Sequence, residues 1–277
     1  MAALNYHRQG AGEPLLLVHG IGSRWQVWLP VLERLAAEHD VIAVDLPGFG
    51  ASLPSPPGTP PGIPSLADAL ESFLDDLGID TAHIGGNSLG GWLALELAKR
   101  GRARSATAFS PAGFYNDRER AFARTSLWLS ARVTRLLASH AELVLASAIG
   151  RTALLGQLVG RPWEVPVQTA VEDLRAFAAA PSFDATLAAI SRERFRDGEA
   201  IDVPVAIAWG QRDFLLIPRQ GPRAVRAIPG AQLVTLRGCG HVPTYDDPRL
   251  VAEVLLAGSR PAQISPQARH ENAVTAR

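Results

Sequence analysis

The sequence predicts an α/β protein with a mostly parallel central sheet, helices on both faces of that sheet, and an inserted all-helical segment. Short apolar runs of strand length alternate with longer segments of helical spacing, which is typical of parallel sheets with helical crossovers. This alternation stops over residues 114–195, where Ala, Leu and Arg recur at helical spacing, and it resumes afterwards.

Before residue 114, four apolar runs have the length of buried strands, and three segments between them have helical spacing. The strands are expected at 14–20, 40–48, 82–87 and 105–111, and the helices at 25–39, 65–79 and 89–101. We expect Ser65 to cap the second helix and Gly101 to end the third. The prolines of residues 53–65 exclude a helix or a central strand, so a stiff surface loop is expected there.

The second half of the chain continues the pattern after an insertion of three or four expected helices. Strands are predicted at 203–210 and 231–238, and helices near 218–228 and 247–258. We therefore expect a core made of residues 1–113 and 196–258, interrupted by the helical segment 114–195. The polar, aperiodic residues 259–277 are expected to be a flexible tail.

Composition narrows the class of protein. The 27 basic and 27 acidic side chains cancel, and no basic stripe suggests nucleic acid or an anionic membrane as a partner. Charged residues interrupt the most hydrophobic region, 127–150, and the N-terminus lacks the apolar core of a signal peptide. The lone Cys239 cannot form an intramolecular disulfide. We expect a cytoplasmic monomer or homodimer with no nucleic-acid or membrane partner.

A candidate nucleophile lies between the predicted strand 82–87 and the helix that follows it. Residues 86–90 read Gly-Asn-Ser-Leu-Gly, the spacing of a nucleophile elbow, in which flanking glycines remove clashes around a strained serine. Ser88 would stand at a helix N-terminus, where backbone amides favour developing negative charge. The alternative interpretation of this stretch is an ordinary helix-capping serine beside a tight turn.

A serine needs a base, and the base needs an orienting acid. Asp213 and His241 each follow a predicted strand, so both are expected at the same sheet edge as Ser88. We expect His241 to accept the proton of Ser88 and Asp213 to orient His241. Other acids, Asp202 and the pair 246–247, precede a strand or begin a helix and are ranked lower. Cys239 lacks an elbow and is expected to be a packing residue.

Two backbone N–H groups are expected to stabilise an oxyanion. One belongs to Leu89, directly after the nucleophile, and the other to Ile21 in the glycine-containing loop after the first strand. Glycines let that loop approach a substrate closely. His19, at the start of the loop, is expected to orient it and not to act as a second base.

The chain resembles the α/β-hydrolase family. The motifs HGIG, DLPGFGAS, GNSLGG, WGQRD and GCGH occur in the family's order, and the resemblance spans about residues 4–258. It implies that residues 114–195 form a helical cap over the active site. The family's first strand looks missing or truncated. The serine nucleophile argues against the haloalkane dehalogenase and epoxide hydrolase branches, whose nucleophile is aspartate.

The expected reaction is hydrolysis of small to medium apolar carboxylic esters through an acyl-enzyme, without a metal or other cofactor. Alternatives are a carbon–carbon hydrolase of meta-cleavage products, a perhydrolase or haloperoxidase relative, and a ligand-binding receptor. Val242 after His241 lowers the carbon–carbon alternative, since that class tends to carry tryptophan there. The expected pocket residues are Trp25, Trp28, Asn87, Phe114, Trp128, Trp163 and Val242. Further apolar candidates on the cap are Phe122, Leu127 and Phe177.

Overall fold

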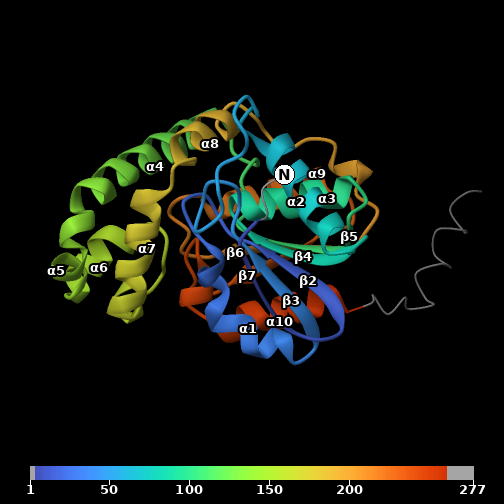
Figure 1. Cartoon of the computed structure of the whole chain (residues 1–277), viewed down its shortest axis with the longest axis horizontal. Helices are drawn as coiled ribbons and strands as arrows, with labels where there is room; N and C mark the ends of the chain where they lie inside the picture. The colour runs from blue at the N-terminus through green and yellow to red at the C-terminus, as the bar shows by residue number, and fades with distance from the viewer. Residues whose placement is uncertain (1–3, 261–277) are drawn as a thin grey trace, which may run out of the picture.

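The computed structural model describes residues 4–260, which form one seven-stranded sheet in the order β1-β3-β2-β4-β5-β6-β7 (Figure 1). Strand β1 pairs with β3 in antiparallel register, and every other pairing is parallel. The strands are β1 Tyr6–Gly10, β2 Glu13–Val18, β3 His39–Val44, β4 Ala82–Asn87, β5 Ala103–Phe109, β6 Val205–Gly210 and β7 Gln232–Leu236.

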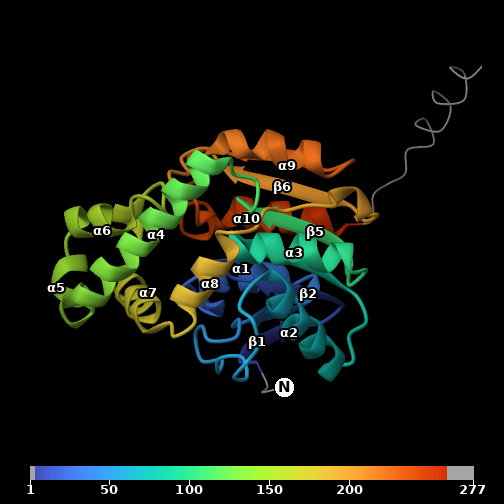
Figure 2. The same cartoon turned by 90° about the horizontal axis from the view of Figure 1, so that it is seen from above.

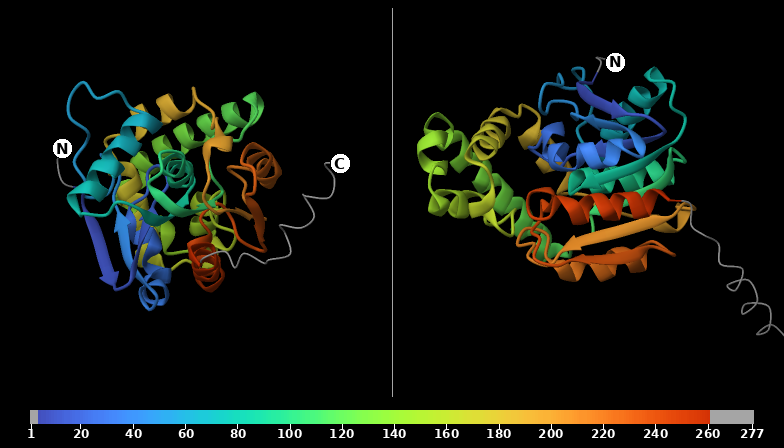
Figure 3. Two further views of the ribbon diagram at one scale, coloured as in Figure 1. Left: turned by 90° about the vertical axis from the view of Figure 1, so that its right-hand side faces the viewer. Right: turned by 90° about the horizontal axis from the view of Figure 1, so that it is seen from below.

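Helices cover both faces of the sheet. Helices α1 and α10 lie on one face, and α2, α3 and α9 lie on the other (Figures 1 and 3). Strand β2 shows why its residues form a continuous apolar run: Leu15 and Leu17 pack toward the first face, Leu16 and Val18 toward the second. The core helices are α1 Leu29–Ala36, α2 Ile63–Asp76, α3 Leu89–Lys99, α9 Gly221–Ala227 and α10 Pro248–Ser259.

The predicted helical insertion lies between β5 and β6 and projects from one side of the sheet (Figure 2). We call it the cap. All residues of the cap belong to the described part of the chain, and the cap contains more α-helices than the three or four expected. They are α4 Asp117–Leu137, α5 Ala141–Leu145, α6 Ala148–Leu155, α7 Val167–Ala179 and α8 Phe183–Ile190. Short 3-10 helices are η1 Trp25–Trp28, η2 Ala138–His140, η3 Pro162–Glu164, η4 Gly198–Ala200, η5 Pro218–Gln220 and η6 Pro243–Tyr245.

The fold class is confirmed, and three local expectations need correction. Strand β1 was not predicted, because its alternating polar residues form no apolar run and it joins the sheet edge through its backbone. Helix α2 begins at Ile63, not at Ser65, since proline is tolerated in a first helical turn. Helix α10 extends through Ser259, so the predicted tail starts too early, and its residues 261–277 lie outside the described chain.

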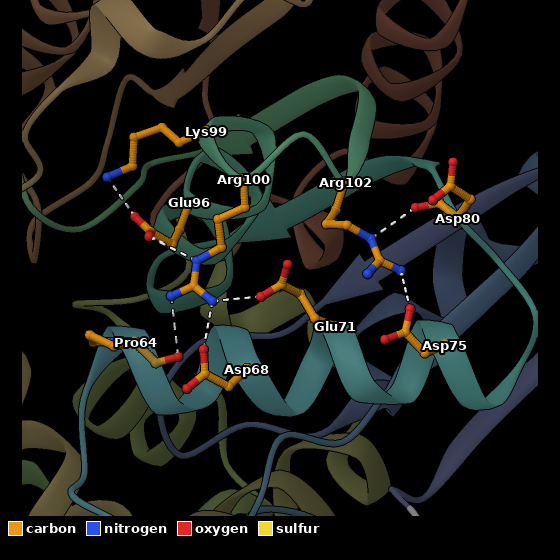
Figure 4. Close-up of polar contacts among 9 residues, drawn as sticks. All are labelled: Pro64, Asp68, Glu71, Asp75, Asp80, Glu96, Lys99, Arg100 and Arg102. Carbon is orange, nitrogen blue, oxygen red and sulfur yellow. Dashed lines mark hydrogen bonds and ion pairs between the residues drawn. The ribbon is translucent and has the colours of Figure 1, made fainter.

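Ion pairs join α2 to the end of α3 (Figure 4). The guanidinium of Arg100 contacts Asp68 and Glu71, both at 2.6 Å, and Arg102 contacts Asp75 at 2.7 Å. These contacts hold the C-terminal end of the helix whose N-terminal end carries the candidate nucleophile. Within residues 4–260, no helix is both long and apolar enough to span a membrane.

Candidate active site

Ser88 lies in a strained turn between β4 and α3. Its backbone has φ 58° and ψ −113°, in the left-handed region that non-glycine residues rarely adopt. Such a conformation costs about 1–3 kcal/mol and persists where the surrounding structure holds it. Here the Ser88 N–H donates to the Phe109 carbonyl at 2.9 Å, and the Ser88 carbonyl accepts from the N–H groups of Trp92 and Ala112 at 3.1 Å each.

The glycines beside Ser88 are required by close backbone contacts. A Cβ on Gly86 would lie 2.0 Å from the Gly90 carbonyl oxygen, and one on Gly90 would lie 2.0 Å from the Val18 carbonyl oxygen. Both distances are far shorter than any real contact, so a side chain at either position would force the turn apart. The local sequence therefore forms the tight turn that its glycine spacing predicts.

His241 and Asp213 form a buried pair. His241 Nδ1 lies 2.8 Å from Asp213 Oδ2, and the two residues are 3% and 1% exposed. The other oxygen of Asp213 accepts the backbone N–H groups of Leu215 and Leu216 at 2.9 and 2.8 Å. With its carboxylate held by these donors, Asp213 fixes a proton on His241 Nδ1 and leaves Nε2 as the basic nitrogen.

Asn87 links the segment of His241 to the elbow. Its side-chain amide donates to the His241 carbonyl at 2.8 Å and to the Phe109 carbonyl at 3.2 Å. Phe109 also receives the backbone N–H of Ser88. The serine and histidine segments are thus tied to the same point of the sheet, and both Ser88 and His241 line one cavity.

The loop after β2 runs directly against the elbow. A Cβ on Gly20 would lie 3.2 Å from the Ser88 Cβ, and Ile21 lines the same cavity as Ser88. His19 is fully buried, with Nδ1 2.7 Å from the Gly20 carbonyl and Nε2 accepting the Leu46 N–H at 3.0 Å. Burial lowers the pKa of His19, which keeps the imidazole neutral in this double contact.

The other candidate acids do not pair with His241. Asp246 is buried and accepts the backbone N–H groups of Gly160, Arg161 and Gly240 at 2.9, 2.8 and 2.7 Å. Asp247 caps α10, and Asp202 is exposed. His241 therefore pairs with Asp213 and not with these acids. Within residues 4–260, no three His, Cys, Asp or Glu side chains are grouped as a metal site requires.

The cavity lies between the sheet edge and the cap. Its core wall comes from the loop after β2, the elbow and the segment of His241, and its cap wall comes from α4, α7 and the region around α6. Most of its lining side chains are apolar. Those on the cap wall are Leu127, Leu154, Leu155, Leu158, Val159, Val165, Ala170, Leu174, Ala176 and Phe177.

Of the expected pocket residues, Asn87 and Val242 line this cavity, as do the cap candidates Leu127 and Phe177. The structure places the others elsewhere. Trp163 is 47% exposed and Phe122 is 52% exposed, both on the outside of the cap.

Four more aromatic residues that were expected in the pocket also lie outside it. Trp28 is buried beneath the sheet, and Trp25 stacks on a histidine of β1. Phe114 packs in the main core, and Trp128 is 45% exposed beneath the guanidinium of Arg132. A large aromatic side chain indicates burial or contact area, but not which space it fills.

The polar residues of the cavity wall that sequence analysis missed include Arg24, Asp173 and Tyr245. Two of them had a usable signal, since Arg24 lies four residues after Gly20, and Tyr245 lies four residues after His241. No sequence signal relates Asp173 to the site, because helix α7 reaches the cavity only through the packing of the cap.

Comparison with known proteins extends these observations. Residues 15–254 match the model of the alpha/beta hydrolase family. An uncharacterised protein of Mycobacterium tuberculosis is 30% identical over 259 residues, which covers 89% of this chain and 75% of that protein. A thermophilic esterase from Thermogutta terrifontis has a similar structure, with TM-score 0.71, 25% identity and 92% of both chains covered.

A meta-cleavage product hydrolase from Pseudomonas fluorescens is similar to the same degree. Its TM-score is 0.70 at 25% identity, with 92% of this chain and 94% of that chain covered. The family match spans most of the chain, and both solved structures align with 92% of it. The chain therefore belongs to the alpha/beta hydrolase family.

Proposed function

We propose that this protein is a serine hydrolase that cleaves uncharged, largely apolar carboxylic esters. One observation carries the proposal: Ser88 in its strained elbow and His241, oriented by buried Asp213, line the same mostly apolar cavity. This is the set of groups that acyl transfer requires, namely a nucleophile, an oriented base and a space for an acyl chain.

Acyl transfer would run in two stages. Ser88 Oγ attacks the ester carbonyl carbon while His241 Nε2 takes the hydroxyl proton, and the N–H groups of Leu89 and Ile21 stabilise the oxyanion. His241 then gives its proton to the departing alkoxy oxygen, which leaves as the alcohol. Water attacks the acyl-enzyme, His241 takes and returns a proton again, and the carboxylic acid leaves with Ser88 restored.

The charge of the cavity favours esters over diketo acids. Among the described residues that line it, Arg24 is the sole arginine or lysine, and its guanidinium already contacts Glu172 at 3.0 Å and Asp173 at 3.4 Å. A substrate carboxylate near Arg24 would thus be repelled by the carboxylates of Glu172 and Asp173, which already neutralise the guanidinium charge. An uncharged substrate avoids that repulsion and the desolvation of its own charge.

Turnover of p-nitrophenyl esters of graded acyl length, compared between the wild type and Ser88→Ala, tests the proposal. We expect the wild type to turn over, and Ser88→Ala to lose at least about 10³-fold in kcat. Ser130→Ala is the matched control, because Ser130 lines the same cavity from the cap. The kcat of Ser130→Ala should remain close to that of the wild type.

Labelling with a fluorophosphonate separates the alternatives. Labelling of Ser88 together with ester turnover supports the proposal. Labelling without turnover of any ester would contradict it and favour carbon–carbon bond hydrolysis or a receptor. A meta-cleavage diketo acid, offered under the same conditions, then distinguishes these two, since a receptor turns over neither substrate.

A further inference from the structure

We propose that Arg24, Asp173 and Tyr245 form a polar subsite of the cavity, which binds an uncharged hydrogen-bonding group of the substrate such as a hydroxyl or an amide. The inference rests on the proposed ester hydrolysis and names its substrate class more narrowly. The preferred substrates would be esters whose acyl or alcohol chain carries such a group away from the ester carbonyl.

The three residues come from three different parts of the site. Arg24 belongs to the loop that packs against Ser88, Asp173 belongs to α7 of the cap, and Tyr245 ends η6 after His241. All three line the cavity. A group bound among them is therefore in the same cavity as Ser88 and His241.

The contacts within the cluster leave hydrogen-bonding capacity unused. The Tyr245 hydroxyl donates to Asp173 Oδ2 at 2.5 Å, whereas within residues 4–260 Asp173 Oδ1 has only the long 3.4 Å contact from Arg24 Nη2. A carboxylate can accept about four hydrogen bonds. The Asp173 side chain retains 27% of its exposure, and Arg24 Nε has no acceptor among the described residues. The cluster is thus not closed on itself.

The surroundings make an uncharged polar ligand the best fit. Apolar side chains of α7 and of the His241 segment flank the cluster, and burial raises the pKa of both Asp173 and Tyr245. A ligand carboxylate would be repelled by Asp173 and Glu172, while a ligand ammonium would approach the Arg24 guanidinium. A hydroxyl or amide can donate to Asp173 and accept from Arg24 without adding a buried charge.

The test uses pairs of p-nitrophenyl esters with matched chain length, one plain and one carrying a terminal hydroxyl, over a series of lengths. We expect the wild type to prefer the hydroxyl-bearing ester in kcat/KM by about tenfold at its best length, as one or two hydrogen bonds would provide. Esters of the same length that end in a carboxylate or an ammonium should be poorer than the hydroxyl-bearing one.

In the variants Tyr245→Phe and Asp173→Asn, the ratio of kcat/KM for the hydroxyl-bearing ester to kcat/KM for the plain ester should fall close to one. Tyr6→Phe is the matched control, because it removes a hydroxyl from a tyrosine of β1 outside the cavity, and it should keep the preference. A cluster that only holds the cap to the core would lower kcat/KM for both esters alike and leave their ratio unchanged. That result would overturn the inference.

Binding separates this inference from the proposed function. The dissociation constants of both esters for Ser88→Ala, measured by calorimetry, should show the same preference without any turnover. Turnover of plain esters by the wild type, with no preference in kinetics or binding, would overturn the subsite alone. Absence of turnover, with preferential binding retained, would overturn the esterase proposal and support the subsite.

Discussion

At the scale of single residues, two buried aspartates near His241 show how position decides role. Asp213 uses one oxygen for two backbone N–H groups and the other for the imidazole. Asp246 gives both oxygens to backbone N–H groups and contacts no imidazole; it joins the turn before His241 to the cap loop at Gly160. In the proposed mechanism, Asp213 orients the base His241, and Asp246 holds the backbone that carries His241.

Replacing each aspartate with asparagine should separate these roles. Asp213→Asn should lower kcat by about 10⁴-fold with little change in Tm, because the wrong tautomer of His241 is then favoured. In Asp246→Asn, the side-chain NH₂ group faces backbone N–H groups that need an acceptor. Each buried N–H left without an acceptor destabilises the fold by about 1–3 kcal/mol, so Tm should fall by several degrees. Steady-state kinetics and calorimetry check both effects; a larger kcat loss for Asp246→Asn would reverse the assignment.

Cys239 lies two residues before His241 and is 1% exposed. Burial raises the pKa of its thiol to about 12, so almost no reactive thiolate exists near neutral pH. We expect an aromatic disulfide reagent to leave the native protein unlabelled and to label one thiol per chain in denaturant. Rapid labelling of the native protein with parallel loss of turnover would contradict this packing role.

At the scale of elements, the start of α4 shows how the cap is attached. Asn116 and Glu119 form a reciprocal capping box, with both hydrogen bonds at 2.9 Å. The buried Glu119 also contacts Arg219 at 2.8 Å and pairs with Arg223, which donates to the Phe114 carbonyl as well. One carboxylate thus joins the first turn of the cap to the segment around α9 of the core.

This attachment predicts a pH-dependent contribution to stability. Burial alone would raise the pKa of Glu119, but the Asn116 N–H and the two guanidinium groups outweigh burial and lower it. A lowered folded-state pKa stabilises the fold above the ordinary glutamate pKa of about 4.3, and this contribution is lost as pH falls through the folded value. Glu119→Gln should therefore lower Tm at neutral pH, with the difference from wild type shrinking in acid.

The control for Glu119→Gln is Asp117→Asn in the same helical turn. The Asp117 side chain is 75% exposed and pairs with Arg120 and Arg194 at the surface. Exposed pairs contribute little, so Tm should barely change at any pH. Equal effects of the two substitutions would show that the buried carboxylate has no special part in attaching the cap.

At the scale of the whole molecule, the apolar interior is divided. The base of the cap, including Phe183 and Leu187, belongs to the main core, whereas the tip of the cap has a small cluster of its own around Leu145 and Leu174. Leu158 and Tyr245 contact that small cluster from the region of the site. The tip is therefore stabilised by less apolar burial than the sheet, and it should open locally before the sheet does.

Leu145→Ala tests this division. Leu145 is fully buried in the tip cluster, so its truncation should cost about 2–5 kcal/mol. We expect hydrogen exchange to accelerate in α5, α6 and α7 while the sheet keeps its protection. Leu17→Ala, in the central strand β2, should instead accelerate exchange throughout the described core. Uniform acceleration by Leu145→Ala would show that cap and core unfold as one unit.

The strands that sequence analysis predicted well are those covered by helices on both faces of the sheet. Strands β2, β3, β5 and β6 contribute apolar side chains to both faces, and β4 is buried along its whole length, so their sequences alone indicate burial. Strand β1 lies at the edge and pairs through its backbone, which leaves no apolar pattern to detect. The start of α2 was placed too late because proline was taken to exclude a helix. In the first turn of a helix the N–H that proline lacks would have no partner, so proline is tolerated there.

The fold class and the order of the candidate residues Ser88, Asp213 and His241 could be predicted from the amino-acid sequence, because strand ends converge at one edge of a parallel sheet. Which side chains surround these residues depends on how the cap packs against the core. The packing of the cap brings Asp173 beside Arg24 and turns most of the expected aromatic residues outward or into the core. Pocket membership depends on packing between elements far apart in the chain, which local sequence patterns do not encode.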